Sequence, residues 1–430
     1  MNKKLGNLFK GDKGIWIVFL LLCVISVIEV FSASSTLTYK SGNYLGPMIY
    51  HTGTLLVGVV VTIVTLNIPC RYFKLITPVM LIISFGTLLW VLLFGESING
   101  ANRVIQLPGF TFQPSELAKG TMVLATAQIL SAMQRDDGRG ADNQAMKYVL
   151  FLLLPMLFLI GIENLSTAML LFAVIFVMMF LGRVPIKQLG KLTGAVFLLA
   201  AVFLVLVFTI GSIEDKKETE VQKTEQTESV AKSEKKGKSV FHRFATWRNR
   251  LINKSADRPK DPKNYVVNDS NFQVSHAYFA IASSGIIGKG PGNSVERDYL
   301  PQAFSDFIYA IIIEEMGIIG AIAVVFLYIM LAFRAGRIAS RCENNFPAFL
   351  VMGLALLLVS QAVINMMVAV GLGPVTGQPL PLVSKGGTST LVNCAYIGII
   401  LSVSRSAKKR DAIVSTRATT AKSENNEEEE

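Results

Sequence analysis

The sequence is poor in charged residues, cysteine and histidine. Only 17% of its 430 residues are Asp, Glu, Lys or Arg, whereas soluble domains usually contain about a quarter. Its four cysteines and three histidines are scattered and lack the spacing of metal ligands. The shortage of charge excludes an ordinary soluble domain. The cysteine pattern argues against a disulfide framework or a zinc site.

Long apolar runs take up most of the chain, which is 51% hydrophobic. Runs of this length are typical of transmembrane helices. They predict an all-α polytopic membrane protein with about ten spans. The expected spans are 14–33, 47–67, 73–94, 115–132, 147–162, 165–182, 190–211, 307–334, 347–370 and 388–405. The fifth and sixth nearly abut at Glu163 and Asn164, which predicts a tight helical hairpin.

Basic residues mark the N-terminus, every second short loop and the start of the C-terminal tail. Cytoplasmic loops of membrane proteins carry such an excess of Lys and Arg. Both termini are therefore predicted to be cytoplasmic. These loops also largely explain the net charge of +11, which does not indicate nucleic-acid binding.

This topology divides the chain into five parts. They are a cytoplasmic segment 1–13, spans one to seven within 14–211, a long extracytoplasmic loop 212–306, spans eight to ten within 307–405, and a cytoplasmic tail 406–430. A polar, charge-rich composition predicts disorder for the insert 214–238 and for the tail. The basic amphipathic stretch Phe241–Lys254 is predicted to lie on the membrane surface.

Three segments rich in Gly and Pro lie on the predicted outer side, within 95–113, 212–306 and 371–387. Irregular backbone at membrane depth is tolerated where protein buries it or where it lines a cavity. The sequence therefore predicts an outward-facing cavity that these loops roof.

Asp306 stands at the mouth of the eighth apolar run. Ser305 or Asp306 could cap the helix that follows, or Asp306 could be a general base that deprotonates a sugar hydroxyl. Glu314 and Glu315 follow roughly 12 Å further along a continuous helix. Because uncompensated charge there is costly, we expect an ion pair, a protonated acid, or a side chain that faces a cavity or partner.

Other polar residues sit at the same predicted surface. Glu116 and Lys119 are spaced i, i+3, so they share a helix face and can pair. Arg103 and Lys385 are outer-loop cations that could clamp a diphosphate or remain solvated. Three further polar residues, Thr376, Gln378 and Ser384, lie among prolines that are expected to break a helix.

Five motifs in this order resemble the SEDS family (shape, elongation, division and sporulation). They are NGANR (Asn99–Arg103), FQPSELAK (Phe112–Lys119), GKGPGNS (Gly288–Ser294), YLPQAFSDFIYAIIIEEMG (Tyr299–Gly317) and PVTGQPLPLVSKGG (Pro374–Gly387). The sequence departs from the family's usual residues at Val104, Asn164, Phe304 and Lys385, where Trp, Asp, His and Tyr are common.

The resemblance implies a peptidoglycan glycosyltransferase of the cytoplasmic (inner) membrane. Such an enzyme polymerises lipid II, a disaccharide-pentapeptide on undecaprenyl pyrophosphate, with Asp306 as catalytic base. A divalent cation (Mg²⁺ or Mn²⁺) or Arg and Lys side chains would offset charge on the leaving group. The implied substrate-binding candidates are Arg103, Gln113, Ser115, Glu116, Lys119, Asp298, Glu315, Thr376, Ser384 and Lys385. No metal ligands are assigned.

The resemblance further implies a class B penicillin-binding protein and other divisome proteins as partners, and a place at the division septum. A division-type enzyme is favoured, with the elongation-type polymerase as the alternative within the family. A lipid II flippase or a non-catalytic scaffold for the transpeptidase are the alternatives from other classes.

Overall fold

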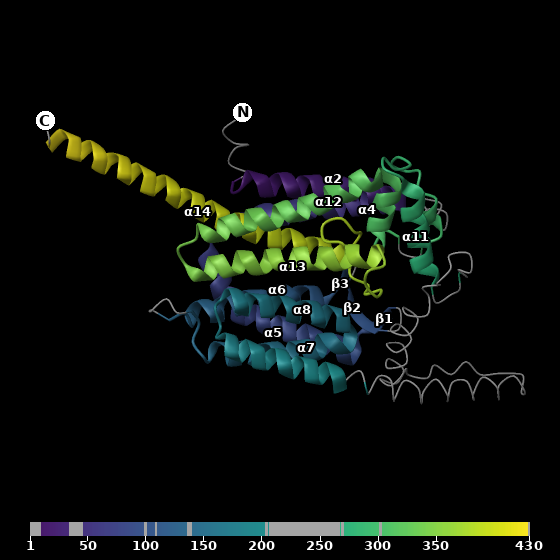
Figure 1. The fold of residues 1–430 in the computed structure, drawn as a ribbon, viewed down its shortest axis with the longest axis horizontal. Helices are drawn as coiled ribbons and strands as arrows, with labels where there is room; N and C mark the ends of the chain where they lie inside the picture. Colours follow the sequence, from purple (N-terminus) through teal and green to yellow (C-terminus); the bar gives the residue numbers. More distant parts are fainter. Residues whose placement is uncertain are drawn as a thin grey trace, which may run out of the picture.

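The computed structural model describes residues 10–33, 46–98, 101–107, 110–135, 140–202, 205, 267, 271–300 and 303–428. The predicted insert 214–238 and the stretch Phe241–Lys254 lie outside these residues. The described part is a bundle of long helices (Figure 1). A small sheet and helix α11 (Phe272–Ser284) lie at one end of the bundle, and the last helix projects from the other.

Helices occupy all ten predicted segments within the described residues. They are α2 (Lys13–Ala33), α4 (Gly46–Asn67), α5 (Cys70–Phe94), α6 (Pro114–Ala132), α7 (Ala145–Glu163), α8 (Leu165–Leu181), helical residues 186–202, α12 (Ile308–Ser340), α13 (Asn345–Ala369) and α14 (Gly387–Glu428). Seven of them are long and apolar enough to span a membrane: α2, α4, α5, α7, α12, α13 and α14. Helix α8 is apolar but has only 17 residues. The all-α polytopic membrane fold is confirmed.

The predicted hairpin of the fifth and sixth segments is present as α7 and α8, joined by Asn164 alone. The Asn164 side chain accepts hydrogen bonds from the amides of Ser166 (3.0 Å) and Thr167 (3.4 Å). Asparagine is a favoured N-cap residue because its side-chain oxygen satisfies these otherwise unpaired amides. Asn164, one of the departures from the family pattern, therefore begins α8.

The loop between α5 and α6 contains strands that the sequence reasoning missed. They are β1 (Glu96–Ile98), β2 (Ala101–Leu107) and β3 (Phe110–Phe112), paired antiparallel in the order β1-β2-β3. The sequence between them is Asn99-Gly100 and Pro108-Gly109. Asn-Gly between two short strands is a strong hairpin signal, so a local cue for this exception to the all-α prediction was available.

Helix α12 is broken at Gly317, where φ is 67° and ψ is −169°. The Gly285–Gly290 turn runs alongside the break, and the Lys289 amide donates to the Glu314 carbonyl at 3.0 Å. A Cβ atom on Gly317 would lie 2.2 Å from the Ile286 carbonyl oxygen, so only glycine fits. Glu314 and Glu315 therefore end a short half-helix, which corrects the expectation of a continuous eighth span.

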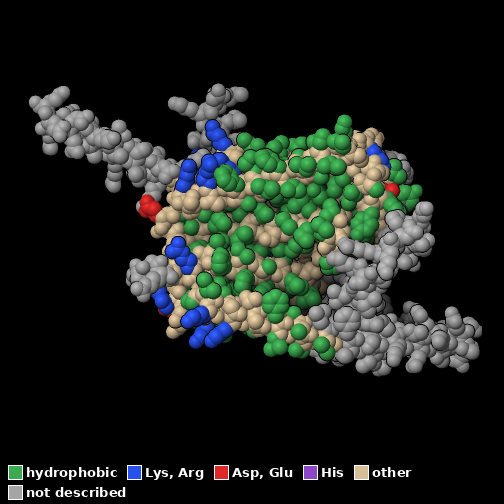
Figure 2. Space-filling model, in the orientation of Figure 1, with side chains coloured by type: hydrophobic (Ala, Val, Ile, Leu, Met, Phe, Trp, Pro, Cys, Tyr) green, Lys and Arg blue, Asp and Glu red, His purple; other side chains and the backbone are tan. Residues whose placement is uncertain are grey.

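The surface agrees with a membrane protein. Hydrophobic side chains cover the flank in Figure 2, and Lys and Arg gather at the end from which α14 projects. On α5, Leu75 and Ile82 are 72% and 73% exposed, as expected of lipid-facing residues. The backbone of α14 continues as a helix to Glu428, whereas disorder was predicted from residue 406. Its Ala, Lys, Glu and Arg content favours helix, which explains the difference.

Candidate active site

Asp306 lies in the turn 303–307 that leads into α12 and is half-buried. The N-cap position of α12 is Phe307, whose side chain cannot accept a hydrogen bond, rather than Ser305 or Asp306. Ser305 Oγ donates to Asp306 Oδ1 at 3.0 Å. This contact orients the carboxylate within the turn that precedes the helix.

The backbone around Asp306 is held at three consecutive carbonyl groups. The donors come from α13 and from the 371–387 loop. They are Lys385 N, 2.9 Å from the Phe304 oxygen, Ser384 Oγ, 2.6 Å from the Ser305 oxygen, and Asn365 Nδ2, 2.9 Å from the Asp306 oxygen. Three fixed carbonyls leave the turn little freedom, so the position of the Asp306 side chain is preorganised.

A cation stands beside this turn. Lys385 Nζ lies 4.9 Å from the centroid of the Phe304 ring, within the range of a cation–π contact. Burial lowers the pKa of the Lys385 ammonium. Phe304 and Lys385 both depart from the usual family pattern, and the structure shows that the two departures touch each other.

The 371–387 loop is anchored in the bundle by its backbone carbonyl groups. Asn365 Nδ2 donates to the Gln378 carbonyl at 2.7 Å, and Gln361 Nε2 donates to the Pro379 carbonyl at 3.1 Å. On the other side, Tyr328 Oη donates to the Pro381 carbonyl at 2.5 Å. The loop lacks regular structure, so these side-chain donors satisfy its buried carbonyls in place of helix bonds.

The predicted pair of Glu116 and Lys119 is present, with Nζ 2.9 Å from Oε1. Both side chains are almost fully buried. Lys119 Nζ also donates to Gln361 Oε1 at 2.7 Å, and Gln361 in turn holds the Pro379 carbonyl. The pair therefore supports the 371–387 loop through Gln361, and its predicted role in substrate binding stays a prediction.

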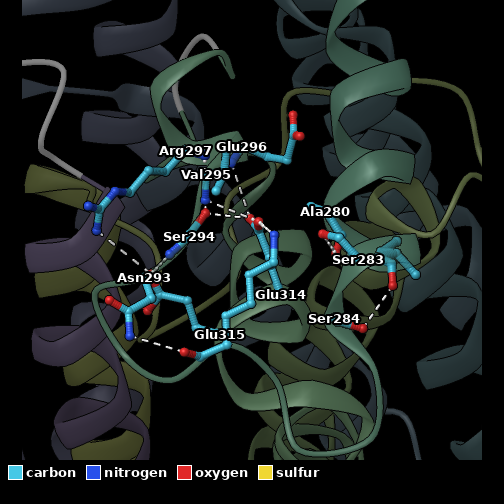
Figure 3. A network of polar contacts seen from close by, with 12 residues as sticks. Ala280, Ser283, Ser284, Asn293, Ser294, Val295, Glu296, Arg297, Glu314 and Glu315 are labelled. Atoms are coloured by element: carbon cyan, nitrogen blue, oxygen red, sulfur yellow. Dashed lines mark hydrogen bonds and ion pairs between the residues drawn. The ribbon is translucent and has the colours of Figure 1, made fainter.

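Glu314 and Glu315 hold the segment that precedes Asp306 (Figure 3). Both side chains are fully buried. Glu314 accepts from Lys289 Nζ (2.5 Å), Val295 N (3.1 Å), Glu296 N (3.3 Å) and Ser294 Oγ, and Glu315 accepts from Gly292 N (3.0 Å), Ser294 N (3.2 Å) and Ser32 Oγ. We call these two acids and residues 289–296 the carboxylate clamp.

The carboxylate clamp joins a segment that precedes Asp306 to a segment that follows it. Residues 289–296 lie before the turn, and Glu314 and Glu315 lie after it. The intervening stretch, which includes the short helix η2 (Glu296–Asp298), is thereby closed into a ring. Glu315, a predicted substrate-binding residue, is buried in this ring and fixes the geometry of the Asp306 segment.

The clamp continues into α2 through residues that the sequence reasoning missed. Arg297 Nη1 donates to Ser32 Oγ at 2.7 Å, and Ser32 Oγ donates to Glu315. One turn earlier on α2, Glu29 is fully buried, and neither of its carboxylate oxygens has a hydrogen-bond partner within the described residues. A glutamate inside an apolar run was the available signal for Glu29. Arg297 offered no such cue.

The remaining candidates lie around the same end of the bundle. Gln113 Nε2 donates to Ser115 Oγ at 3.2 Å, and the Gln113 amide donates to Thr388 Oγ1 at 3.3 Å, which joins the sheet to the start of α14. Asp298 is in η2 with its side chain 45% exposed, and Thr376 is half-buried in the 371–387 loop. Arg103 lies in β2, and its side chain is outside the described residues.

A metal cage was not found in the part of the chain that the structure describes, where no three His, Cys, Asp or Glu side chains gather around one point. Mg²⁺ commonly binds through one or two carboxylates and the phosphates of a substrate rather than through a protein cage. Asp298, in η2, is exposed, and Asp306, in the turn 303–307, is half-buried. They fit that manner of binding.

Comparison with known proteins places this geometry in a family. A family model covering FtsW, RodA and SpoVE, described as "Cell cycle protein", matches residues 12–409. The chain belongs to the FtsW/RodA/SpoVE family. The match covers almost all of the sequence, so the SEDS resemblance is confirmed.

Two curated relatives carry the name "Probable peptidoglycan glycosyltransferase FtsW". The protein of Geobacter sp. (strain M18) is 28% identical over 91% of this chain and 96% of its own length. That of Pseudomonas fluorescens (strain SBW25) is 30% identical over 89% of this chain and 85% of its own length.

Two solved structures share the fold of this family member. One comes from work titled "Structural coordination of polymerization and crosslinking by a peptidoglycan synthase complex", with a TM-score of 0.66, 22% identity, and coverage of 93% of this chain and 99% of the other. The Thermus thermophilus rod shape determining protein RodA gives a TM-score of 0.60 at 22% identity, covering 93% and 98%. The polytopic FtsW/RodA architecture therefore applies to this chain.

Proposed function

We propose that this FtsW/RodA family member is a peptidoglycan glycosyltransferase that polymerises lipid II at the outer face of the cytoplasmic membrane. The names of its relatives support the reaction class. The observation that carries the proposal is the turn at Asp306, a half-buried carboxylate whose backbone is fixed at three carbonyl groups. The FtsW names favour the division-type role over the elongation-type one.

In the proposed reaction Asp306 removes the proton from the 4-hydroxyl of the acceptor sugar. The hydroxyl oxygen then attacks the anomeric carbon of the donor, and the bond from that carbon to the diphosphate oxygen breaks. Undecaprenyl diphosphate leaves as an anion, so the leaving group needs no proton from an acid. The Lys385 ammonium, next to Phe304, is positioned to offset the charge that develops on the diphosphate.

A divalent cation is a further part of the proposal. Mg²⁺ or Mn²⁺ bound by Asp298 or Asp306 together with the substrate diphosphate would supply charge neutralisation at the leaving group.

The proposed partner is a class B penicillin-binding protein, with other divisome proteins, at the septum. The similarity to a chain studied in a peptidoglycan synthase complex supports a transpeptidase partner. In that arrangement the glycan strand made at Asp306 passes to the partner for crosslinking.

The test is polymerisation of fluorescent lipid II by purified full-length protein with its transpeptidase. Asp306→Asn and Asp306→Ala are each expected to lower the rate by 10²–10⁴-fold, the usual contribution of a positioned base. Asp142→Asn is the matched control, because Asp142 is partly exposed, pairs with Arg135 at 3.6 Å and lies in a different loop. Normal glycan synthesis by both Asp306 variants overturns the assignment.

The alternative transporter function is tested with the same purified protein. The protein is reconstituted into sealed vesicles with lipid II in one leaflet. The amount of lipid II that becomes accessible in the other leaflet is then measured. Movement of lipid II without polymer formation favours a flippase, and neither movement nor polymer favours a scaffold.

A further inference from the structure

A polar cavity lies at the opposite end of the bundle from Asp306. It has a volume of about 100 Å³ and lies between the residue before α2, the last turns of α12 and the end of the membrane-spanning part of α14. On this measure about 10–15 Å³ holds one water molecule, so the space is large enough for one phosphate-sized group. The protein's basic side chains gather at the same end (Figure 2).

The lining of this cavity is net positive. Three arginines line it, Arg334 and Arg337 from the end of α12 and Arg341 at its C-cap position, against the single carboxylate of Asp12. Their spacing of three and four residues places them in a row on the helix. A guanidinium group suits phosphate because its planar fork of N–H donors matches two phosphate oxygens.

Asp12 is already engaged with one of these arginines. Arg334 Nε lies 2.9 Å from Asp12 Oδ1, and Arg334 Nη2 lies 2.5 Å from Oδ2. This bidentate pair fixes one wall, and the Asp12 charge is used there. Arg337 instead has its Cζ 5.0 Å from the centroid of the Phe333 ring and remains exposed at the mouth.

The opposite wall supplies a hydroxyl and an apolar floor. Ser404 and Ala407 of α14 line the cavity there with their side chains buried, and Ile338 adds an apolar side chain from α12. A tetrahedral oxyanion with an apolar attachment matches this combination of arginines, a hydroxyl and a methyl-lined floor.

We propose that this cavity binds the phosphate headgroup of an anionic phospholipid of the cytoplasmic leaflet. The cavity lies where membrane-spanning helices end, and basic pockets between such helices on the cytoplasmic side are the sites at which anionic lipid headgroups bind. The bound headgroup links α12 to α14. The plain structural alternative is that the arginines only complement the C-terminal dipole of α12 and the positive-inside pattern.

The experiment is native mass spectrometry of the purified full-length protein titrated with phosphatidylglycerol, with phosphatidylcholine as the neutral lipid. One phosphatidylglycerol molecule is expected to bind tightly. Arg337→Ala combined with Arg341→Ala is expected to weaken it about 10- to 30-fold, at about one tenfold step or less for each basic residue. Arg334 is left in place because it pairs with Asp12.

The matched control is Arg71→Ala combined with Lys74→Ala, which removes two charges from the start of α5, outside the cavity. Arg337→Lys with Arg341→Lys retains charge and is expected to recover part of the affinity. Equal binding by wild type and the double alanine variant overturns the proposal. Displacement of the lipid by millimolar inorganic phosphate also overturns it, in favour of a soluble anion. The readout does not depend on glycan synthesis.

Discussion

Replacing Glu314 by glutamine tests whether the carboxylate clamp holds the Asp306 segment. Each Glu314 oxygen accepts two hydrogen bonds, one pair from Lys289 Nζ and Val295 N, the other from Ser294 Oγ and Glu296 N. An amide keeps one oxygen but puts an NH₂ group in place of the other. With the NH₂ group turned toward Ser294, whose hydroxyl can accept from it, the Glu296 amide still faces a donor beside a fully buried side chain.

The magnitude follows from the lost contact at the Glu296 amide. A hydrogen bond to a charged group contributes about 1.5–3 kcal/mol, so Glu314→Gln costs the closed loop at least that much. At 1.4 kcal/mol for each factor of ten, the equilibrium constant for local opening rises at least about 10-fold. Polymerisation is expected to fall to the extent that the altered loop displaces Asp306, because a displacement of about 1 Å at a reacting group can cost 10²-fold.

The assay is hydrogen–deuterium exchange followed on peptides that cover residues 288–298, with glycan synthesis measured on the same preparation. Glu343→Gln is the control, since Glu343 is an exposed acid between α12 and α13. Asp306→Asn is expected to abolish synthesis while exchange stays as in the wild type. If residues 288–298 of Glu314→Gln exchange at the same rate as in wild type, the reasoning is refuted, whatever the activity.

Two further predictions concern pH. Burial lowers the pKa of Lys385, so its charge is lost at a lower pH than that of a free lysine. Polymerisation by wild type is expected to fall on the alkaline side before that of Lys385→Arg, and superimposable pH–rate profiles contradict this. Burial, the largest single influence, would raise the pKa of Asp12, but the hydrogen bonds from Arg334 and the backbone amides and the charge of Arg334 together outweigh it, so the pKa is lowered. The pair therefore stabilises fully above the ordinary value of 3.8, and its contribution is lost as the pH falls through the lowered value. At pH 7 the free energy of unfolding of Asp12→Asn is expected to be about 1–3 kcal/mol smaller than that of wild type, which appears as a lower thermal midpoint. The difference is expected to close in that acidic range. A gap that is independent of pH contradicts the assignment.

Local signals in the sequence were enough for features that depend on residues close together in the chain. The Glu116 and Lys119 pair follows from i, i+3 spacing, and the α7–α8 hairpin follows from the end of one apolar run at Asn164. Asp306 stood out because a charge beside a long apolar run is rare. These elements needed no knowledge of tertiary contacts.

Features made by distant segments could not be predicted. Gly317 follows Glu314 and Glu315 inside a long apolar run, and its positive φ is required only by the turn at Ile286, far back in the chain. For the same reason Glu314 and Glu315 suggested membrane-embedded charges rather than acceptors for backbone amides. Gln361 and Asn365 are spaced i, i+4 in an apolar helix, which was a local cue, but their partners lie in the 371–387 loop.

The pairing of Asp12 with Arg334 has a consequence for how the chain is made. The two residues are 322 positions apart, and at roughly 5–20 residues per second a ribosome needs roughly 15–65 s to add that length. Ser26 meets His51 early, at a separation of 25 residues, but its carbonyl partner is Val383. Throughout this interval α2 sits in the bilayer with most of its polar face unmatched.

Helix α2 is therefore made well before the residues that pair with its polar side chains. Ser32 has no Glu315 to bond, and Glu29 faces lipid or a temporary neighbour until α12 is inserted. A chain that stops before α12 exposes these groups permanently, and an ionisable group facing lipid is costly. Completion of the chain through α12 is thus what gives the polar residues of α2 their partners.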